Sequence, residues 1–126
     1  MEELISRVMA AGGIDQGLAQ KAVGMILGFL KKEGPADSVS ALMGALPGAD
    51  ALVAESAGGG GMIGGLMGMM GGGGVMGLGA QMMGAGMSMG QIQSISKEVF
   101  AFGREKAGED AMGAIVGAIP GLGQFV

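Results

Sequence analysis

The chain has 126 residues, which is the length of one compact domain, and its 7 basic and 11 acidic side chains give a net charge of −4. It contains no cysteine and no histidine, so disulfides, thiolate nucleophiles and imidazole bases or ligands are excluded. No run of lysine or arginine supplies the positive charge that nucleic-acid binding needs. We therefore expect a non-enzymatic protein with no cofactor and no nucleic-acid partner.

Residues 1–55 have the apolar spacing of three helices. Gly12 and Gly13 interrupt the first helix, and Asp15 is well placed to cap the second. The third helix is expected to end just before Pro47, because a proline disfavours helical geometry in the residue that precedes it. The three apolar faces are formed by Leu4, Ile5, Val8 and Met9, by Ala19, Ala22, Ile26 and Phe29, and by Val39, Leu42, Met43 and Leu46.

Residues 56–96 contain no charged residue, and nine of the 14 methionines lie between Met62 and Met89. Glycines recur there at every fourth position, which on a helix makes a groove without side chains and lets another backbone approach closely. We expect an interaction surface for a second copy of the chain or for another protein. It would consist of Gly60, Gly64, Gly68 and Gly72 along the groove, with Met62, Ile63, Leu66, Met67, Met69 and Met70 beside it.

Three other interpretations of residues 56–96 stay open. In the first the stretch is a linker, because glycine-rich chains behave as flexible coils. In the second it is an apolar hairpin that associates with a membrane, since an uncharged apolar run of roughly 18 or more residues is a candidate span. The acidic start of the chain lacks the basic and apolar regions of a secretory signal, so the protein is otherwise expected in the cytoplasm. In the third, thioethers bind Cu(I), and the ligands would come from Met67, Met69, Met70, Met82, Met83, Met87 and Met89.

Residues 88–126 follow the plan of the first part again, 73 positions further on. Ser88 and Gln91 have the spacing of a capping box at a helix start. Pro120 stands where the last helix should end, as Pro47 does in the first part. The two apolar faces are formed by Ile92, Ile95, Val99 and Phe102 and by Met112, Ile115, Val116 and Ile119.

This gap-free correspondence predicts two copies of a helical hairpin, each with an apolar face that it cannot bury alone. Packed face to face, they would form an all-α bundle of four or five helices with a Gly/Met-rich central segment. We expect one compact domain in which residues 1–55 hold the first hairpin, residues 56–87 the central segment and residues 88–126 the second hairpin. Asp37 and Asp110 match in this register, either as an acid–base or cation-binding pair or, as we favour, as acids that stabilise two helix N-termini.

Residues 41–52, Ala-Leu-Met-Gly-Ala-Leu-Pro-Gly-Ala-Asp-Ala-Leu, precede the glycine-rich tract and the second helical part. This order of parts resembles the Vcg-like proteins, a bacterial family of small helical proteins of unknown function. The most specific piece of the resemblance is Leu-Pro-Gly-Ala-Asp at residues 46–50. The resemblance implies a bacterial helical protein and implies no activity, no cofactor and no functional residues.

Overall fold

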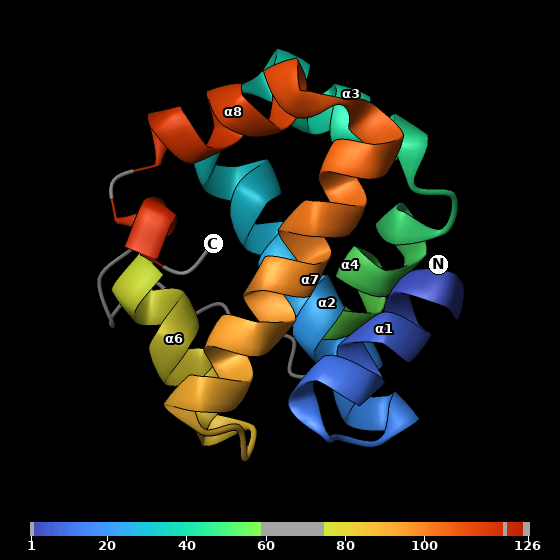
Figure 1. The fold of residues 1–126 in the computed structure, drawn as a ribbon, viewed down its shortest axis with the longest axis vertical. Helices are drawn as coiled ribbons and strands as arrows, with labels where there is room; N and C mark the ends of the chain where they lie inside the picture. Colours follow the sequence, from blue (N-terminus) through green and yellow to red (C-terminus); the bar gives the residue numbers. More distant parts are fainter. Residues whose placement is uncertain (1, 59–74, 120, 125–126) are drawn as a thin grey trace.

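The structure is a computed structural model that describes residues 2–58, 75–119 and 121–124 (Figure 1). Every regular element in these ranges is a helix, so the predicted all-α class is confirmed. Seven α-helices are present there, which is more than the four or five that were predicted. They are α1 (Glu2–Gly12), α2 (Gln16–Glu33), α3 (Ala36–Ala45), α4 (Ala49–Gly58), α6 (Val75–Gly84), α7 (Met89–Ala107) and α8 (Glu109–Ala118), followed by a 3₁₀ turn, η1 (Leu122–Gln124).

The two long helices begin at the caps that the sequence predicts. The Asp15 carboxylate accepts a hydrogen bond from the backbone N–H of Leu18 at 2.8 Å, at the start of α2. The Ser88 hydroxyl accepts a hydrogen bond from the backbone N–H of Gln91 at 3.3 Å. The Gln91 side chain in turn accepts one from the Ser88 backbone N–H at 2.8 Å, which completes a capping box at the start of α7. Each cap satisfies backbone donors that the first turn of a helix leaves free.

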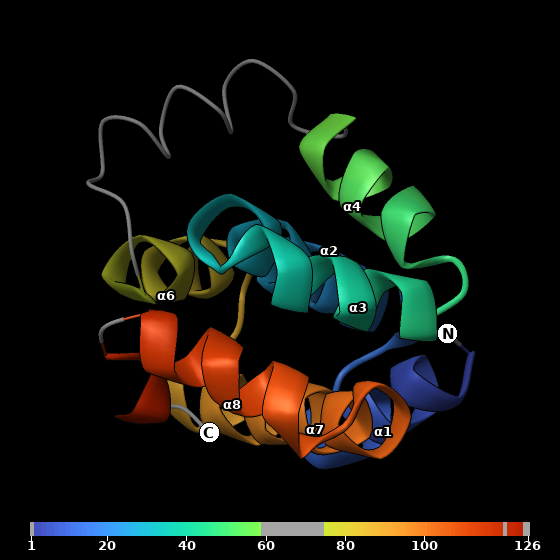
Figure 2. The same cartoon turned by 90° about the horizontal axis from the view of Figure 1, so that it is seen from above.

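The helices lie in two layers (Figure 2). One layer contains α1, α7 and α8, and the other contains α2 and α3 with α6 at one edge and α4 on the outside. The two layers meet where α2 packs against α1, α6 against α7, and α3 against both α7 and α8. The long helices α2 and α7 also contact each other directly, so each of them has neighbours on more than one side.

The core lies between the layers, and α2 contributes more to it than the sequence predicts. The predicted α2 face is buried at Ala19, Ala22 and Ile26, but Phe29 is only partly buried. The second side of α2 is also buried, because α1 and α4 pack on this helix as well; it consists of Val23, Gly24, Leu27 and Leu30. On α7 the predicted face, Ile92, Ile95, Val99 and Phe102, is buried in full.

Two helices were not foreseen in the sequence. Helix α4 packs mainly on α2 and buries Ala49 and Leu52. Helix α6 forms although it contains Gly77 and Gly79, each of which costs about 1 kcal/mol relative to alanine in a helix. Its Leu78 and Met82 are buried in the core. The helical state of α6 therefore depends on tertiary packing, which local sequence patterns do not report.

Candidate interaction surfaces

The predicted interaction groove lies outside the residues that the structure describes. All ten of its members, from Gly60 to Gly72, fall within residues 59–74. The described parts of the uncharged stretch are residues 56–58, at the end of α4, and residues 75–96, which form α6, the turn after it and the first half of α7. The exposed side chains of α6, of the turn after it and of the start of α7 therefore form the described surface of the uncharged stretch.

Two exposed methionines mark that surface. The Met83 side chain on α6 is 51% exposed and that of Met89 in the first turn of α7 is 47% exposed. Among residues 2–54, 77–119 and 121–123, whose side-chain exposure the structure describes, no other large apolar side chain is exposed. We define these two residues as the methionine pair. Thioether side chains are flexible and polarisable, and they adapt to the shape of a partner, so exposed methionines are common on binding surfaces.

The neighbouring methionines have a different role. Met82 is fully buried and Met87 is 3% exposed, and both belong to the apolar core. Met82 is next to the exposed Met83 in the sequence, and Met87 is two positions before the exposed Met89. Within each of these pairs, therefore, one methionine lies in the core and the other faces solvent. This division favours packing over Cu(I) coordination for Met82 and Met87, because the ligands of one ion must converge on it.

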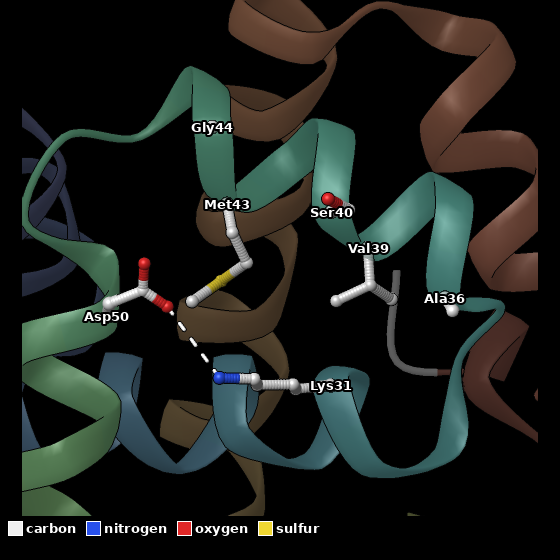
Figure 3. A pocket seen from close by; sticks show the side chains of 7 residues that line it. All are labelled: Lys31, Ala36, Val39, Ser40, Met43, Gly44 and Asp50. Carbon is white, nitrogen blue, oxygen red and sulfur yellow. Dashed lines mark ion pairs between the residues drawn. The ribbon is translucent and has the colours of Figure 1, made fainter.

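A groove of about 530 Å³ lies between α2, α3 and α4 (Figure 3). Lys31 of α2 and Asp50 of α4 point toward each other along one side, with 3.7 Å between Nζ and Oδ1. The Met43 side chain of α3 extends between them and the rest of the groove. The other lining residues, all on α3, are Ala36, Val39, Ser40 and Gly44. Such a groove offers an apolar wall with one exposed ion pair, which suits an apolar segment better than a charged metabolite.

A second groove of about 420 Å³ lies on the other side of α4, where it meets α1 and α2. Its wall is mixed, since apolar side chains, uncharged polar side chains and one acidic side chain contribute. The lining residues are Glu2, Ile5, Ser6, Met9, Gln16, Gln20 and Leu52. Helix α4 is thus flanked by a groove on each side while it packs mainly on α2.

The main cluster of charged side chains joins α1 to α7. Arg7 donates from Nε to Glu98 at 3.0 Å and from a terminal nitrogen to Glu105 at 2.6 Å. The guanidinium carbon lies 5.4 Å from the centre of the Phe102 ring, and Lys106 Nζ lies at the same distance from that ring. The hydrogen bond to Glu105 is the main cause of a raised pKa for Arg7, to which Glu98 adds. An arginine with a raised pKa stays charged, so Arg7 links α1 to α7 through its ion pairs and takes no part in proton transfer.

The two matched aspartates are not brought together. Asp37 lies in the first turn of α3 and Asp110 in the first turn of α8. These helices run in opposite directions in both views, so their first turns lie at opposite ends of the pair (Figures 1 and 2). Each carboxylate therefore sits at a helix N-terminus, where the backbone dipole favours a negative charge.

The described residues hold no metal-ligand cluster and no membrane-spanning helix. Over residues 2–58, 75–119 and 121–124, no group of three or more acidic side chains is placed to hold a metal ion. None of the helices in those ranges is both long enough and apolar enough to cross a membrane. No family model, no curated protein and no solved structure matches the chain.

Sequence reasoning missed the methionine pair, the grooves beside α4 and the Arg7 cluster. For Met89 a signal was present: Ser88 caps α7, so the next residue, Met89, begins the first turn of that helix. The other features gave no such signal. The partners of Arg7 are 91 and 98 residues away along the chain, and the grooves arise where three helices meet.

Proposed function

We propose that the protein is a non-enzymatic interaction protein that associates with itself, or with a protein partner, through the uncharged residues 56–96. The observation that carries the proposal is the methionine pair. Among the side chains whose exposure the structure describes, the two exposed large apolar ones both belong to this stretch. Exposed thioether side chains are flexible and polarisable enough to adapt to a partner's surface, which supports association through this stretch.

We also propose that the chain contains two copies of one helical unit, related by a shift of 73 positions. The caps Asp15 and Ser88 match in this register. So do two pairs of glycines with positive φ, Gly13 (63°) with Gly86 (107°) and Gly48 (89°) with Gly121 (84°). Positive φ is readily adopted by glycine alone, so the agreement extends to backbone conformation as well as sequence. It supports a duplicated bundle.

Membrane contact through the same stretch is the alternative, and it shares the methionine pair as its contact surface. Membership of the Vcg-like family, a bacterial source and a cytoplasmic location stay predictions from the sequence. Cu(I) binding stays a prediction for Met67, Met69 and Met70, which lie outside the described residues.

The test is the molar mass of the protein in solution, measured by size-exclusion chromatography with light scattering over a range of concentrations. We expect a defined oligomer of the 12.3 kDa chain. The double change Met83→Gln and Met89→Gln should weaken it at least about tenfold, because burying one methionine side chain contributes roughly 1.5–3 kcal/mol and 1.4 kcal/mol is a factor of ten in affinity. The matched control is Ala41→Gln with Ala51→Gln, which places glutamine at two exposed positions outside the uncharged stretch.

Three results would contradict self-association through this surface. The first is a monomer at every concentration, and the second is an oligomer that the methionine variant leaves unchanged. The third is a monomer that co-elutes with lipid vesicles only while Met83 and Met89 are present, which would establish the membrane alternative instead.

A further inference from the structure

Methionine is the only sulfur-containing residue type in this chain, which has 14 methionines and no cysteine. Tryptophan, tyrosine and histidine, the other side chains that mild oxidants modify, are absent as well. A peroxide that meets the protein therefore reacts at thioethers and converts them to sulfoxides. The order in which the thioethers react depends on their exposure, because the oxidant must reach the sulfur atom.

The structure divides the described methionines by exposure. Met83 and Met89, the methionine pair, are exposed, whereas Met82 and Met112 are fully buried and Met87 is almost fully buried. The others whose exposure the structure describes are partly or almost completely buried, and they are Met9, Met25 and Met43. Among these side chains, the methionine pair is the part that an oxidant reaches without any opening of the fold.

Glycines leave the approach to the methionine pair open. Gly84 follows Met83, Gly90 follows Met89, and Gly86 lies in the turn between the two helices. At each of these three glycines, an added Cβ would meet no neighbouring atom within 4 Å. On this side the two thioethers adjoin bare backbone, which does not shield them from a small oxidant.

Oxidation of either side chain is a two-electron oxygen transfer. The thioether sulfur attacks one oxygen of hydrogen peroxide, an S–O bond forms and the O–O bond breaks. The proton of the attacked hydroxyl moves to the other oxygen, which leaves as water. The sulfoxide that results is polar, unlike the thioether. A methionine sulfoxide reductase reverses the reaction with a dithiol, which becomes a disulfide as the oxygen leaves as water.

We propose that the methionine pair is a reversible oxidation site, and that its sulfoxides switch off the association of the chain. This inference rests on the proposed function, because it adds a control to the surface that the proposed function assigns. A sulfoxide at either position would bring a polar oxygen into the interface, and the desolvation of that oxygen opposes association. Oxidation takes place on the dissociated chain, where both side chains are exposed, and it then prevents reassociation.

The buried methionines let the fold survive the same treatment. Met82 and Met87 belong to the core, so an oxidant reaches them only when the structure opens locally. A sulfoxide at either position would place a polar group among apolar side chains and would destabilise the fold. Because the methionine pair reacts first, association is lost while the helices stay folded.

The first experiment measures which methionines react. The full-length protein is treated with hydrogen peroxide for increasing times, and oxidation at each methionine is quantified by peptide mapping with mass spectrometry. We expect Met83 and Met89 to react at least about tenfold faster than Met82 and Met87. Equal rates at these four positions would overturn the assignment of the modification site, whatever the oligomeric state.

The second experiment measures association by light scattering before and after this treatment. With Met83 and Met89 oxidised, the affinity should fall at least about tenfold, while the melting temperature stays within about 3 °C. Treatment with a methionine sulfoxide reductase and a dithiol should restore association. The matched control is Met83→Leu with Met89→Leu, which keeps the apolar area and cannot be oxidised. It should associate as the unchanged protein does, both before and after peroxide.

Two results would overturn the switch while leaving association in place. One is an unchanged affinity in protein whose Met83 and Met89 are shown by mapping to be sulfoxides, and this result needs no variant. The other is a leucine variant that peroxide dissociates as readily as the unchanged protein, since other methionines would then be responsible.

Failure of the proposed function is visible separately, before any oxidation. It takes the form of a monomer at every concentration, or of an oligomer that Met83→Gln with Met89→Gln leaves unchanged. Either result also removes the switch, and the mapping experiment still decides whether the methionine pair is the preferred site of oxidation.

Discussion

Gly34 and Gly44 show how differently two glycines contribute to this fold. At Gly34, which ends α2, an added Cβ would lie 2.7 Å from the carbonyl oxygen of Leu30 and 2.7 Å from a methyl carbon of Val39. At Gly44, inside α3, no atom lies within 4 Å of that position. The first glycine is needed because the backbone passes too close for any side chain, and the second only weakens its helix.

Alanine at these two positions should therefore act in opposite directions. We expect Gly34→Ala to lower the free energy of unfolding by about 1–3 kcal/mol, since a backbone carbonyl cannot move aside as a side chain does. Gly44→Ala should raise it by about 0.5–1 kcal/mol through better helix propensity. Urea unfolding followed by circular dichroism measures both. Equal effects at the two sites would contradict the close approach at Gly34.

Residue-scale predictions from the sequence succeed where the determinant is local. The caps Asp15 and Ser88 were predicted correctly, because the donor and acceptor of a cap are only three residues apart. The two phenylalanines in the same register, Phe29 and Phe102, were both expected on a buried face, yet only Phe102 is fully buried. Phe102 has Lys106, one helical turn further on, and Arg7 of α1 over its ring. The contact with Arg7 joins residues far apart in the sequence, so periodicity does not reveal it.

At the scale of the element, α7 depends on its first turn. Its capping box ties Ser88 to Gln91, and Gln91 also reaches back to Gly12 of α1. The start of α7 is therefore connected both to its own backbone and to a neighbouring helix.

We expect Ser88→Ala to reduce the free energy of unfolding by about 1 kcal/mol, within the range of 0.5–2 for the loss of a side-chain cap. The matched control is Ser40→Ala, the same substitution at an exposed position inside α3, which should be neutral or slightly stabilising. Thermal melts of both variants at one pH test this. A Ser88 variant as stable as the control would mean that α7 needs no cap.

Elements were predictable wherever apolar periodicity and stop signals agreed. Helices α2, α3, α7 and α8 have both, and their faces were identified correctly apart from the second buried side of α2 and from Phe29 and Val116, which are only partly buried. Helices α4 and α6 have neither, since glycine and small residues leave no clear period. Their existence rests on Leu52, Leu78 and Met82, which are buried against helices far away in the sequence.

At the scale of the whole molecule, charge is confined to the surface and to the Arg7 cluster. The pKa of Arg7 is raised above its ordinary value, first by the hydrogen bond to Glu105. A raised pKa in the folded state contributes stability that is fully present below the unfolded value and is lost only as pH rises through the folded value. For an arginine that loss lies in strongly alkaline solution, far outside the neutral range.

We therefore expect the melting temperature to stay within about 2 °C between pH 6 and pH 9, because the chain has no histidine or cysteine whose ordinary pKa lies in that range. Scanning calorimetry in buffers of equal ionic strength provides the measurement. A clear transition near pH 7 would contradict this expectation.

The class of the molecule was predictable and its packing was not. An all-helical protein follows from the spacing of apolar residues along the chain. The placement of α1 on α7 does not follow from that spacing. An apolar face predicts that a helix is covered, but it does not identify the helix that covers it. The same limit applies to the grooves beside α4, which exist only once α1, α2 and α3 are in place.

The interleaving of α1 with α7 has a consequence for synthesis on the ribosome. The hydrogen bonds that hold α1 join residues 79 to 98 positions apart. At about 5–20 residues per second, α1 emerges roughly 4–20 s before α7 is made. Throughout that interval Leu4 and Val8, both fully buried in the finished fold, lack the surface that covers them. The nascent chain is thus exposed to chaperones, and to neighbouring nascent chains, until α7 has been translated.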